Sequence, residues 1–442
     1  MRISWCIVWA LVAAGLVPAQ ARLAAGPMVG HATETRVTLW LRTESTARVQ
    51  VRCWPEERLD LARLSAEQVT TEADDHCLHI AFDDLPFGTR FHYEVYLDGR
   101  VVPIEWPLRF ATQSHWNFRL PPPDFSVAIG SCAYVNDPPM DRKGRAYGGD
   151  PVIFEALAAA RPDLMLWLGD NLYFRDPDWS SESGMRSRYR KARGLKQLQP
   201  FLGATSHYAI WDDHDFGAND SDRTNALKDA ALRTFRLYWA NAGDSAGGQP
   251  GVQNRFTWGD AEFFLLDDRY HRSPNAAPDD ADKTMFGTTQ IDWLLDSLSN
   301  SEATFKIIAG GNQFLNPMCY FEGLGSFARD RERILTGLSE RKISGVLFLS
   351  GDRHQAELIK VEREGTYPLY DFTSSPLLAG LHAVTRELEN PARVPGTLVF
   401  ETRNFGRLSF SGPRGERIVR ISCHGVDGQE LWHHELAEST LR

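Results

Sequence analysis

Side chains that commonly bind metal ions follow the ends of four strand-like apolar segments in this sequence. They are Cys132, then Asp170 and Tyr173, then Asp213 and Asn219, and finally Asp352 and His354. In open α/β sheets ligands bind beyond the carboxyl ends of the strands, so we expect the four loops to meet there. Taken singly, each loop also fits an ordinary turn, a buried structural cysteine or a surface ion pair. Four loops with complementary ligands rarely arise by chance, and together they predict a metal site.

The ligand atoms divide into two chemical types. The Cys132 thiolate and the Tyr173 phenolate are anionic donors that, with His354, suit a transition metal, and the phenolate favours a highly charged ion such as Fe³⁺. Hard oxygen donors suited to calcium, magnesium or manganese come from Asp213, Asn219 and Asp352. Asp170 lies between the two sets and can bridge two ions. Two ions ~3.5–4 Å apart can hold a phosphoryl group in line and turn bound water into a nucleophile.

Other polar residues near these loops are candidates for contact with a substrate. His214 can donate a proton to a leaving oxygen or stabilise it. Arg269, in the segment 267–272 after another strand-like run, can hold a phosphate oxygen; pairing with a neighbouring aspartate is the alternative. We also expect Asn171 and Arg353 to contact the substrate. A basic segment either surrounds the pocket or forms a solvated helix face, and it comprises Arg186, Arg188, Arg190, Lys191, Arg193 and Lys196.

The composition is that of a folded acidic protein. Of the 442 residues, 43% are hydrophobic and 24% are charged, which excludes a disordered chain or a multi-span membrane protein. The net charge of −10 repels a phosphate backbone, so we do not expect nucleic-acid binding. Bound cations can still attract a small anionic substrate. The sequence does not determine the oligomeric state, and we expect a monomer.

The N-terminus has the pattern of a secretory signal peptide. An apolar run from Ile3 to Val17 is followed by Ala19-Gln20-Ala21, the small-x-small form that a signal peptidase cleaves. The run is shorter than the ~20 residues of a membrane span. We expect residues 1–21 to be removed after Ala21, leaving a periplasmic or secreted protein without a transmembrane segment. An uncleaved anchor is the alternative.

The rest of the chain divides into an all-β part and an α/β part. Alternating segments within residues 22–113 predict a small β-sandwich. Residues 114–123 form a linker that ends in three prolines. Strands alternate with helices in residues 124–442, which is typical of a layered α/β domain, and the strands after about 398 should complete its sheets. Strands are predicted at 125–129, 164–168, 208–211, 263–266, 305–309 and 346–350, and helices at 151–160, 225–239 and 290–298.

The cysteines remaining after the signal peptide are odd in number, in a compartment that favours disulfides. They are Cys53, Cys77, Cys132, Cys319 and Cys423. We expect a bridge between Cys53 and Cys77. Cys319 and Cys423 can form another, which would leave Cys132 free for a different role.

Four motifs resemble those of the PhoD-like alkaline phosphatase family, metallophosphoesterases related to the purple acid phosphatases. They read Ser131-Cys132, Gly169-Asp170-Asn171-Leu172-Tyr173, Trp211-Asp212-Asp213-His214-Asp215 and Ser350-Gly351-Asp352-Arg353-His354. The combination is specific, because purple acid phosphatases have an aspartate in place of the cysteine. The resemblance covers most of the chain. It implies a catalytic domain with a β-sandwich core flanked by helices, preceded by an immunoglobulin- or fibronectin-like sandwich. For that first domain we expect a structural supporting role.

The resemblance also implies the metals and the reaction. Ferric iron (Fe³⁺) would be bound by Cys132, Asp170, Tyr173 and His354. Calcium (Ca²⁺), or another divalent ion such as Mn, Mg or Zn, would lie near Asp170, Asp213 and Asp352, with Asn219 as a further ligand. Family members hydrolyse phosphomonoesters, and several cleave diesters.

Two positions depart from the family pattern. Asp215 stands where family members often have glutamate, which keeps the charge but shortens the reach. No histidine aligns with a further second-metal ligand of purple acid phosphatases; Asn312 or Gln313 falls near that place, and a neutral amide would favour calcium over zinc.

We therefore expect an exported metal-dependent phosphoesterase of the alkaline phosphatase D type. A metal-bound hydroxide would attack phosphorus in line, and His214 would assist departure of the alcohol. A phosphodiesterase or phospholipase D-like enzyme with the same metal site is the alternative. A non-catalytic metal-dependent binding protein is a further alternative from another class.

Overall fold

The computed structural model describes residues 21–117, 120–141, 143–243, 246–318 and 321–442. The predicted signal peptide lies outside these residues except for Ala21, so the cleavage site stays a prediction. Within the described part of the chain, no helix is long and apolar enough to cross a membrane.

The largest sheet has nine strands and runs through both parts of the chain. In spatial order they are β21 (Glu430–Ala437), β20 (Ile418–Gly425), β19 (Asn404–Ser411), β10 (Phe125–Gly130), β11 (Leu164–Leu168), β12 (Ser206–Ile210), β1 (Leu23–Ala32), β2 (Val37–Thr43) and β6 (Cys77–Phe82). The strands β10, β11 and β12 are parallel neighbours, so their carboxyl ends lie at one edge. The late strands β19, β20 and β21 extend this sheet beside β10, as expected for residues after about 398.

A six-stranded sheet packs against the nine-stranded one. Its spatial order is β13 (Asn254–Trp258), β14 (Ala261–Leu265), β15 (Phe305–Ala309), β16 (Val346–Ser350), β18 (Leu369–Thr373) and β17 (Glu357–Val361). Aromatic side chains join the two sheets: Tyr208 of β12 stacks on Phe256 of β13 with ring centroids 3.7 Å apart. Phe305 of β15 meets Phe410 of β19 edge-on at 5.2 Å. The two sheets form the sandwich core of the α/β part.

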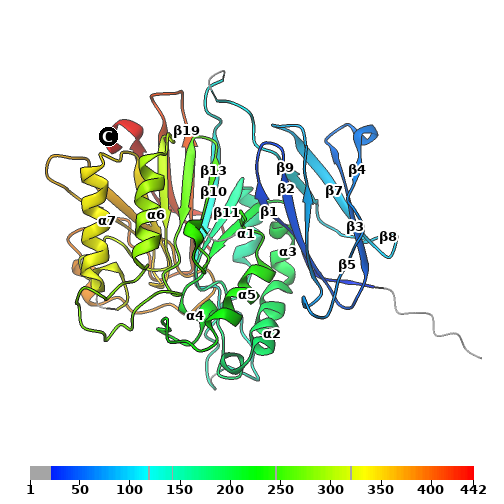
Figure 1. The fold of residues 1–442 in the computed structure, drawn as a ribbon, viewed down its shortest axis with the longest axis horizontal. Coiled ribbons are helices and arrows are strands. Elements are labelled where there is room, and N and C mark those ends of the chain that lie inside the picture. The colour runs from blue at the N-terminus through cyan, green and yellow to red at the C-terminus, as the bar shows by residue number, and fades with distance from the viewer. Residues whose placement is uncertain (1–20, 118–119, 142, 244–245, 319–320) are drawn as a thin grey trace, which may run out of the picture.

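Helices cover the outer faces of these two sheets (Figure 1). They are α1 (Ile153–Ala160), α2 (Glu182–Arg193), α3 (Gln199–Leu202), α5 (Lys228–Tyr238), α6 (Thr288–Ser299) and α7 (Ala328–Glu340), whereas the short helix α4 (Asp213–Phe216) follows the carboxyl end of β12. Phe154 of α1 packs on Trp167 of β11, whereas Trp293 of α6 packs on Phe264 of β14 in the other sheet. Strands covered on both faces must be apolar throughout, and every residue of β11 is buried.

The N-terminal part is a β-sandwich whose two sheets differ in their connections. One sheet contains β3 (Arg48–Pro55), β4 (Arg63–Leu64), β5 (Gln68–Val69), β7 (Arg90–Leu97), β8 (Arg100–Val101) and β9 (Arg109–Ala111). The other consists of β1, β2 and β6, which continue the nine-stranded sheet because Val29 of β1 pairs with Ser206 of β12 in parallel. Layered α/β architecture after a small β-sandwich confirms the predicted fold class. Since one sheet joins the two parts, the boundaries at 113 and 124 stay a prediction.

The expected disulfide between Cys53 and Cys77 is wrong. Both cysteines are free and buried, and they lie on β3 and β6, in the two different sheets of the sandwich. A disulfide requires Cα atoms within about 7 Å and side chains that point toward each other, and on these two strands neither thiol meets a partner. Cys423 also carries a free thiol, and its expected partner Cys319 lies outside the described residues.

Candidate metal centre

The loops after β10, β11, β12 and β16 meet at one edge of the sheets, and glycines allow their close approach. Gly169 follows β11 with φ +86°, and a Cβ there would lie 2.6 Å from the Cβ of Asp212 in the loop after β12. A Cβ on Gly351, after β16, would lie 2.5 Å from the Leu168 carbonyl oxygen. Only glycine fits at these two places, so the glycines fix how near the ligand loops come.

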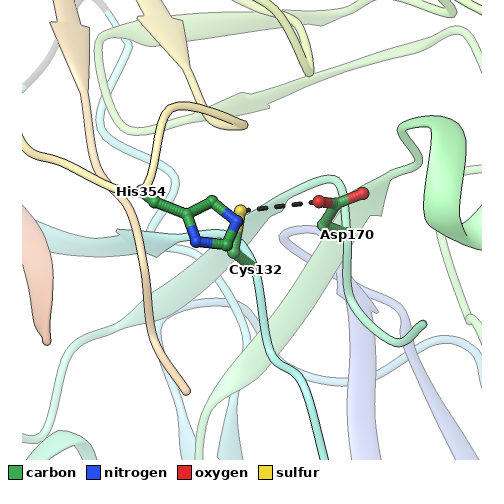
Figure 2. Close-up of side chains that lie close together, drawn as sticks. All are labelled: Cys132, Asp170 and His354. Carbon is green, nitrogen blue, oxygen red and sulfur yellow. Dashed lines mark hydrogen bonds between the residues drawn. The ribbon is translucent and has the colours of Figure 1, made fainter. Parts of the chain in front are cut away.

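Three buried metal-ligand side chains point toward one another at this edge (Figure 2). The Cys132 Sγ lies 3.5 Å from Asp170 Oδ2, and one donor atom from each of Cys132, Asp170 and His354 lies within 4.8 Å of the others. The Tyr173 hydroxyl lies 3.3 Å from His354 Nε2. The structure therefore brings together all four residues expected around ferric iron.

The orientation of the His354 ring leaves one nitrogen available to a metal. Its Nδ1 lies 2.5 Å from the Gly380 carbonyl oxygen, which only accepts hydrogen bonds, so Nδ1 carries the proton. The unprotonated Nε2 then faces Tyr173. A second hydrogen bond of this kind usually orients metal-binding histidines.

Four of the ligand residues have a left-handed backbone, which non-glycine residues seldom adopt. Their φ angles are 60° for Cys132, 51° for Asp170, 65° for Asp352 and 55° for His354. Each such conformation costs on the order of 1–3 kcal/mol and persists where the surroundings impose it, commonly at functional sites.

Burial and mutual repulsion make these acidic groups hard to ionise without a cation. Burial, followed by the charge of Asp352, raises the pKa of Cys132 to about 11. Burial and then Asp213 raise the pKa of Asp170 well above its usual range, and burial and then Asp170 do the same for Tyr173. A multivalent cation would offset this accumulation of negative charge.

A second and a third group of donor atoms extend from the first. Asp170, Asp213 and His214 each place one donor atom within 4.8 Å of the others, and so do Asp213, Asp220 and Glu322. Asp170 thus belongs to both of the first two groups, as expected of a bridging ligand. Asp220 and Glu322 were missed from the sequence; the only signal was that Asp220 directly follows the predicted ligand Asn219.

The second and third groups line one cleft of about 530 Å³ together with His354, whereas Cys132 and Tyr173 are not part of its wall. The predicted residues Asn219, Asp352 and Arg353 also line it, although Asp352 joins none of the close groups found among the described residues. Its wall includes residues for which the sequence held no signal, namely Tyr147, Asn275, Phe321, Gln355, His382 and Glu387. Arg353 is held on this wall by an ion pair with Glu387.

Asn171 and Asp215 lie behind the cleft and connect two ligand loops. Asp215 Oδ1 accepts the backbone N–H of Asn171 at 3.0 Å, and Oδ2 accepts that of Asp212 at 3.1 Å. The Asn171 side chain donates to the Ile210 carbonyl at 2.7 Å and is absent from the cleft wall. The structure therefore places Asn171 as a support for the loops, and the shorter Asp215 still reaches both of them.

Arg269 does not reach the cleft, contrary to the expectation of a phosphate contact. Its side chain is 0% exposed; its Nε donates to Asp212 at 2.5 Å and its Nη2 pairs with Glu322 at 2.5 Å. Because both carboxylates bind its guanidinium, Arg269 is not free to bind a phosphate. The alternative expectation, pairing with a neighbouring aspartate, is what the structure has.

Asn312 and Gln313 do not take the place of a second-metal ligand. The Asn312 amide donates to Asp212 at 3.0 Å and the Gln313 amide donates to Glu357 at 2.9 Å. Both residues are buried and neither is part of the cleft wall. Hydrogen bonds to buried carboxylates hold them away from the ligands.

Five of the six basic residues lie on α2 and Lys196 lies just after it, and none of them is part of the cleft wall. Arg188 is buried and pairs with Asp137 and Asp178, and Arg190 pairs with Asp75 of the sandwich at 2.7 Å. Lys191 and Lys196 are exposed, so the alternative of a solvated face describes only part of the segment.

Comparisons with known proteins agree with this geometry. A model of the PhoD-like phosphatase family matches residues 128–393, and a family described as a domain of unknown function (DUF7800) matches residues 20–114. Alkaline phosphatase D of Bacillus subtilis (strain 168) is 23% identical in an alignment of length 248 that covers 46% of this chain and 42% of that protein. The chain thus matches less than half the length of this curated relative.

Two solved structures share the fold over almost the whole chain. A structure of PhoD has a TM-score of 0.77 and 17% identity, covering 95% of this chain and 91% of that one. The purple acid phosphatase PPD1 from yellow lupin (Lupinus luteus) seeds has a TM-score of 0.68 and 10% identity, covering 93% and 74%. Since the matching family model spans well over half of the chain and includes all four ligand loops, this chain belongs to the PhoD-like phosphatase family.

Proposed function

We propose that this chain is an exported metal-dependent phosphoesterase that hydrolyses small phosphate esters. One observation carries the proposal: the shared Asp170 connects a buried group of thiol, phenol and imidazole to a second group of donors that lines one cleft. Such an arrangement suits two adjacent cations and a phosphoryl group held between them. Export rests on the apolar N-terminal segment of the sequence.

The donor set fits the metals that the family implies. The Cys132 sulfur, the Tyr173 oxygen and His354 Nε2 are the anionic and imidazole donors that suit ferric iron. Oxygen donors that suit calcium, or Mn, Mg or Zn in its place, are provided by Asp213, Asn219, Asp220 and Asp352. When bound, such ions would draw charge from the phosphoryl oxygens and activate water as the nucleophile.

We propose that His214 donates the proton to the leaving alcohol. Its ring packs on Tyr173 with centroids 4.1 Å apart, and it lines the cleft beside Asp170 and Asp213. Burial lowers the pKa of His214, and the neighbouring Asp213 carboxylate opposes that effect and favours the protonated ring. We assign His214 as the proton donor, and Arg353, held by Glu387, as the donor of N–H groups to a phosphoryl oxygen.

The name of the curated relative, alkaline phosphatase D, supports a monoester as the preferred substrate. Hydrolysis of a diester needs the same metals, so the shape of the cleft around them decides between monoester and diester. We therefore propose a phosphomonoester as the substrate class and make the diester an outcome of the test.

The test compares nitrophenyl phosphate with the bis(nitrophenyl) diester, using mature protein supplied with iron and calcium. Asp170→Asn should lose activity by more than about a hundredfold, because supporting residues alone typically cost 10–100-fold. Asp427→Asn, in an exposed turn between β20 and β21, is the matched control and should keep it. Faster diester turnover would transfer the assignment to a phosphodiesterase. If metal-loaded parent protein hydrolysed neither substrate faster than Asp170→Asn, the proposed enzymatic function would be contradicted and a binding protein would be favoured.

A further inference from the structure

Tyr173 has few apolar neighbours to hold its ring in place. With Cys132 and Ala379 it forms a small buried cluster separate from the main hydrophobic core, and Tyr134 packs on that cluster. The Tyr134 ring lies 5.1 Å from the Tyr173 ring and 4.7 Å from that of Tyr147. Tyr134 therefore covers the ring of an expected metal ligand on the side toward the loop 133–141.

Tyr134 is itself fixed by an ion pair. Its hydroxyl donates to Asp141 Oδ1 at 2.7 Å, and the Arg175 guanidinium carbon lies 3.8 Å from the centre of its ring. Arg175 donates to the same Asp141 oxygen at 3.2 and 3.3 Å, and each of these side chains is only 12% exposed. Stacking of an arginine on an aromatic ring adds to the pairing when both are largely removed from water.

Arg175 also holds the backbone of the expected ligand. Its Nη1 donates to the Tyr173 carbonyl oxygen at 2.5 Å. One guanidinium thus binds the main chain of Tyr173 and the ring that covers the side chain of Tyr173. The Tyr134 hydroxyl is engaged by Asp141, so it is a support for the site and not a further ligand.

We propose that Tyr134, clamped by Asp141 and Arg175, positions the Tyr173 phenol for metal binding. Tyr134 is a positioning residue, because it acts on the metal through Tyr173. This inference rests on the proposed function, since it takes Tyr173 as a ligand of a ferric ion. The position of the Tyr173 ring can be measured without the metal, which keeps the two claims separable.

The first test is crystallographic and uses metal-free protein. In Tyr134→Leu the Tyr173 ring should leave its position or become disordered, while Cys132 and Asp170 stay in place. In Tyr134→Phe, which keeps the covering ring and its contact with Arg175 and loses only the hydrogen bond to Asp141, Tyr173 should stay much closer to its parent position than in Tyr134→Leu. An undisplaced Tyr173 ring in Tyr134→Leu would overturn the proposal.

The second test measures iron release from protein loaded with ferric iron and calcium. Release to a chelator should be on the order of tenfold faster in Tyr134→Leu, with a shifted phenolate-to-iron absorption band, and close to the parent rate in Tyr134→Phe. The matched control is Tyr96→Leu, which removes a tyrosine bonded at 2.6 Å to Glu94, a carboxylate that also pairs with Arg52 in the sandwich.

The outcomes of the second test separate the two claims. Unchanged release in Tyr134→Leu, or an equal change in Tyr96→Leu, would contradict a positioning role. If the parent bound no iron, the ferric assignment would fail, and the crystallographic comparison alone would decide the role of Tyr134.

Discussion

The Asp170 carboxylate accepts a hydrogen bond from the backbone N–H of His214, with Oδ1 and N 3.3 Å apart. The other oxygen of the same carboxylate faces the Cys132 sulfur at 3.5 Å. The proposed bridging ligand is therefore oriented by the loop that carries the proposed proton donor. Any movement of that loop would alter both the metal site and the proton donor.

Asp215 should be needed for activity although it does not line the cleft. Asp215→Asn replaces one acceptor oxygen by an NH₂ group, which cannot accept the N–H of Asn171 or Asp212. We expect a loss of about 10–100-fold in activity and in metal affinity, the range typical of residues that support metal ligands. Turnover and bound metal should be measured together. Asp215→Glu, which keeps both acceptors, should retain most activity; full activity in Asp215→Asn would refute the supporting role.

Arg269 should matter for stability more than for substrate affinity. Arg269→Met leaves the Asp212 and Glu322 carboxylates without their buried partner, which typically costs about 3–5 kcal/mol. Arg333→Met, which removes an exposed pair with Asp292, should cost less than about 1 kcal/mol. Urea unfolding measures both. If Arg269→Met were as stable as the parent and had a raised KM, that result would support a contact between Arg269 and the phosphate.

Gly169 should tolerate no side chain. In Gly169→Ala the new Cβ adds a clash with Asp212 to the strain of a positive φ, and we expect a cost about 2 kcal/mol above that of a control. Gly365→Ala is that control, because its φ is +70° and no atom lies within 4 Å of an added Cβ. Thermal unfolding and metal content report the difference. Equal costs for the two variants would show that the loops move apart easily.

Asp371 should make the metal-free protein less stable as the pH rises. It lies on β18, where burial raises the pKa of its carboxyl from the usual 3.8 to about 6. Between these two values the folded state binds more protons than the unfolded state, so the free energy of unfolding falls with increasing pH. Over that interval the loss approaches roughly 3 kcal/mol.

The contribution of Asp371 can be isolated by comparison with Asp371→Asn, which lacks the titrating group. The free energy of unfolding of both proteins should be measured in urea at pH 4 and at pH 7. From pH 4 to pH 7 the parent should lose stability relative to Asp371→Asn. A difference independent of pH would mean that Asp371 is already ionised at pH 4.

The sequence predicted best what depends on local pattern. The run 164–168 is apolar throughout and forms β11, and Asp170 follows at its carboxyl end as expected. The sequence predicted poorly the contacts that depend on residues far apart along the chain. Cys53 and Cys77 are near in sequence but lie on different sheets, and Arg269 is occupied partly by Glu322, which follows no strand.

The pairing of β1 with β12 affects how well the α/β part would behave without the N-terminal sandwich. Without residues 22–113, β12 would become an outer strand with unpaired N–H and C=O groups, a structure that invites aggregation. The N-terminal sandwich therefore acts as a built-in edge cover for its neighbour. A chain truncated in this way would keep every residue of the metal centre but would be less soluble.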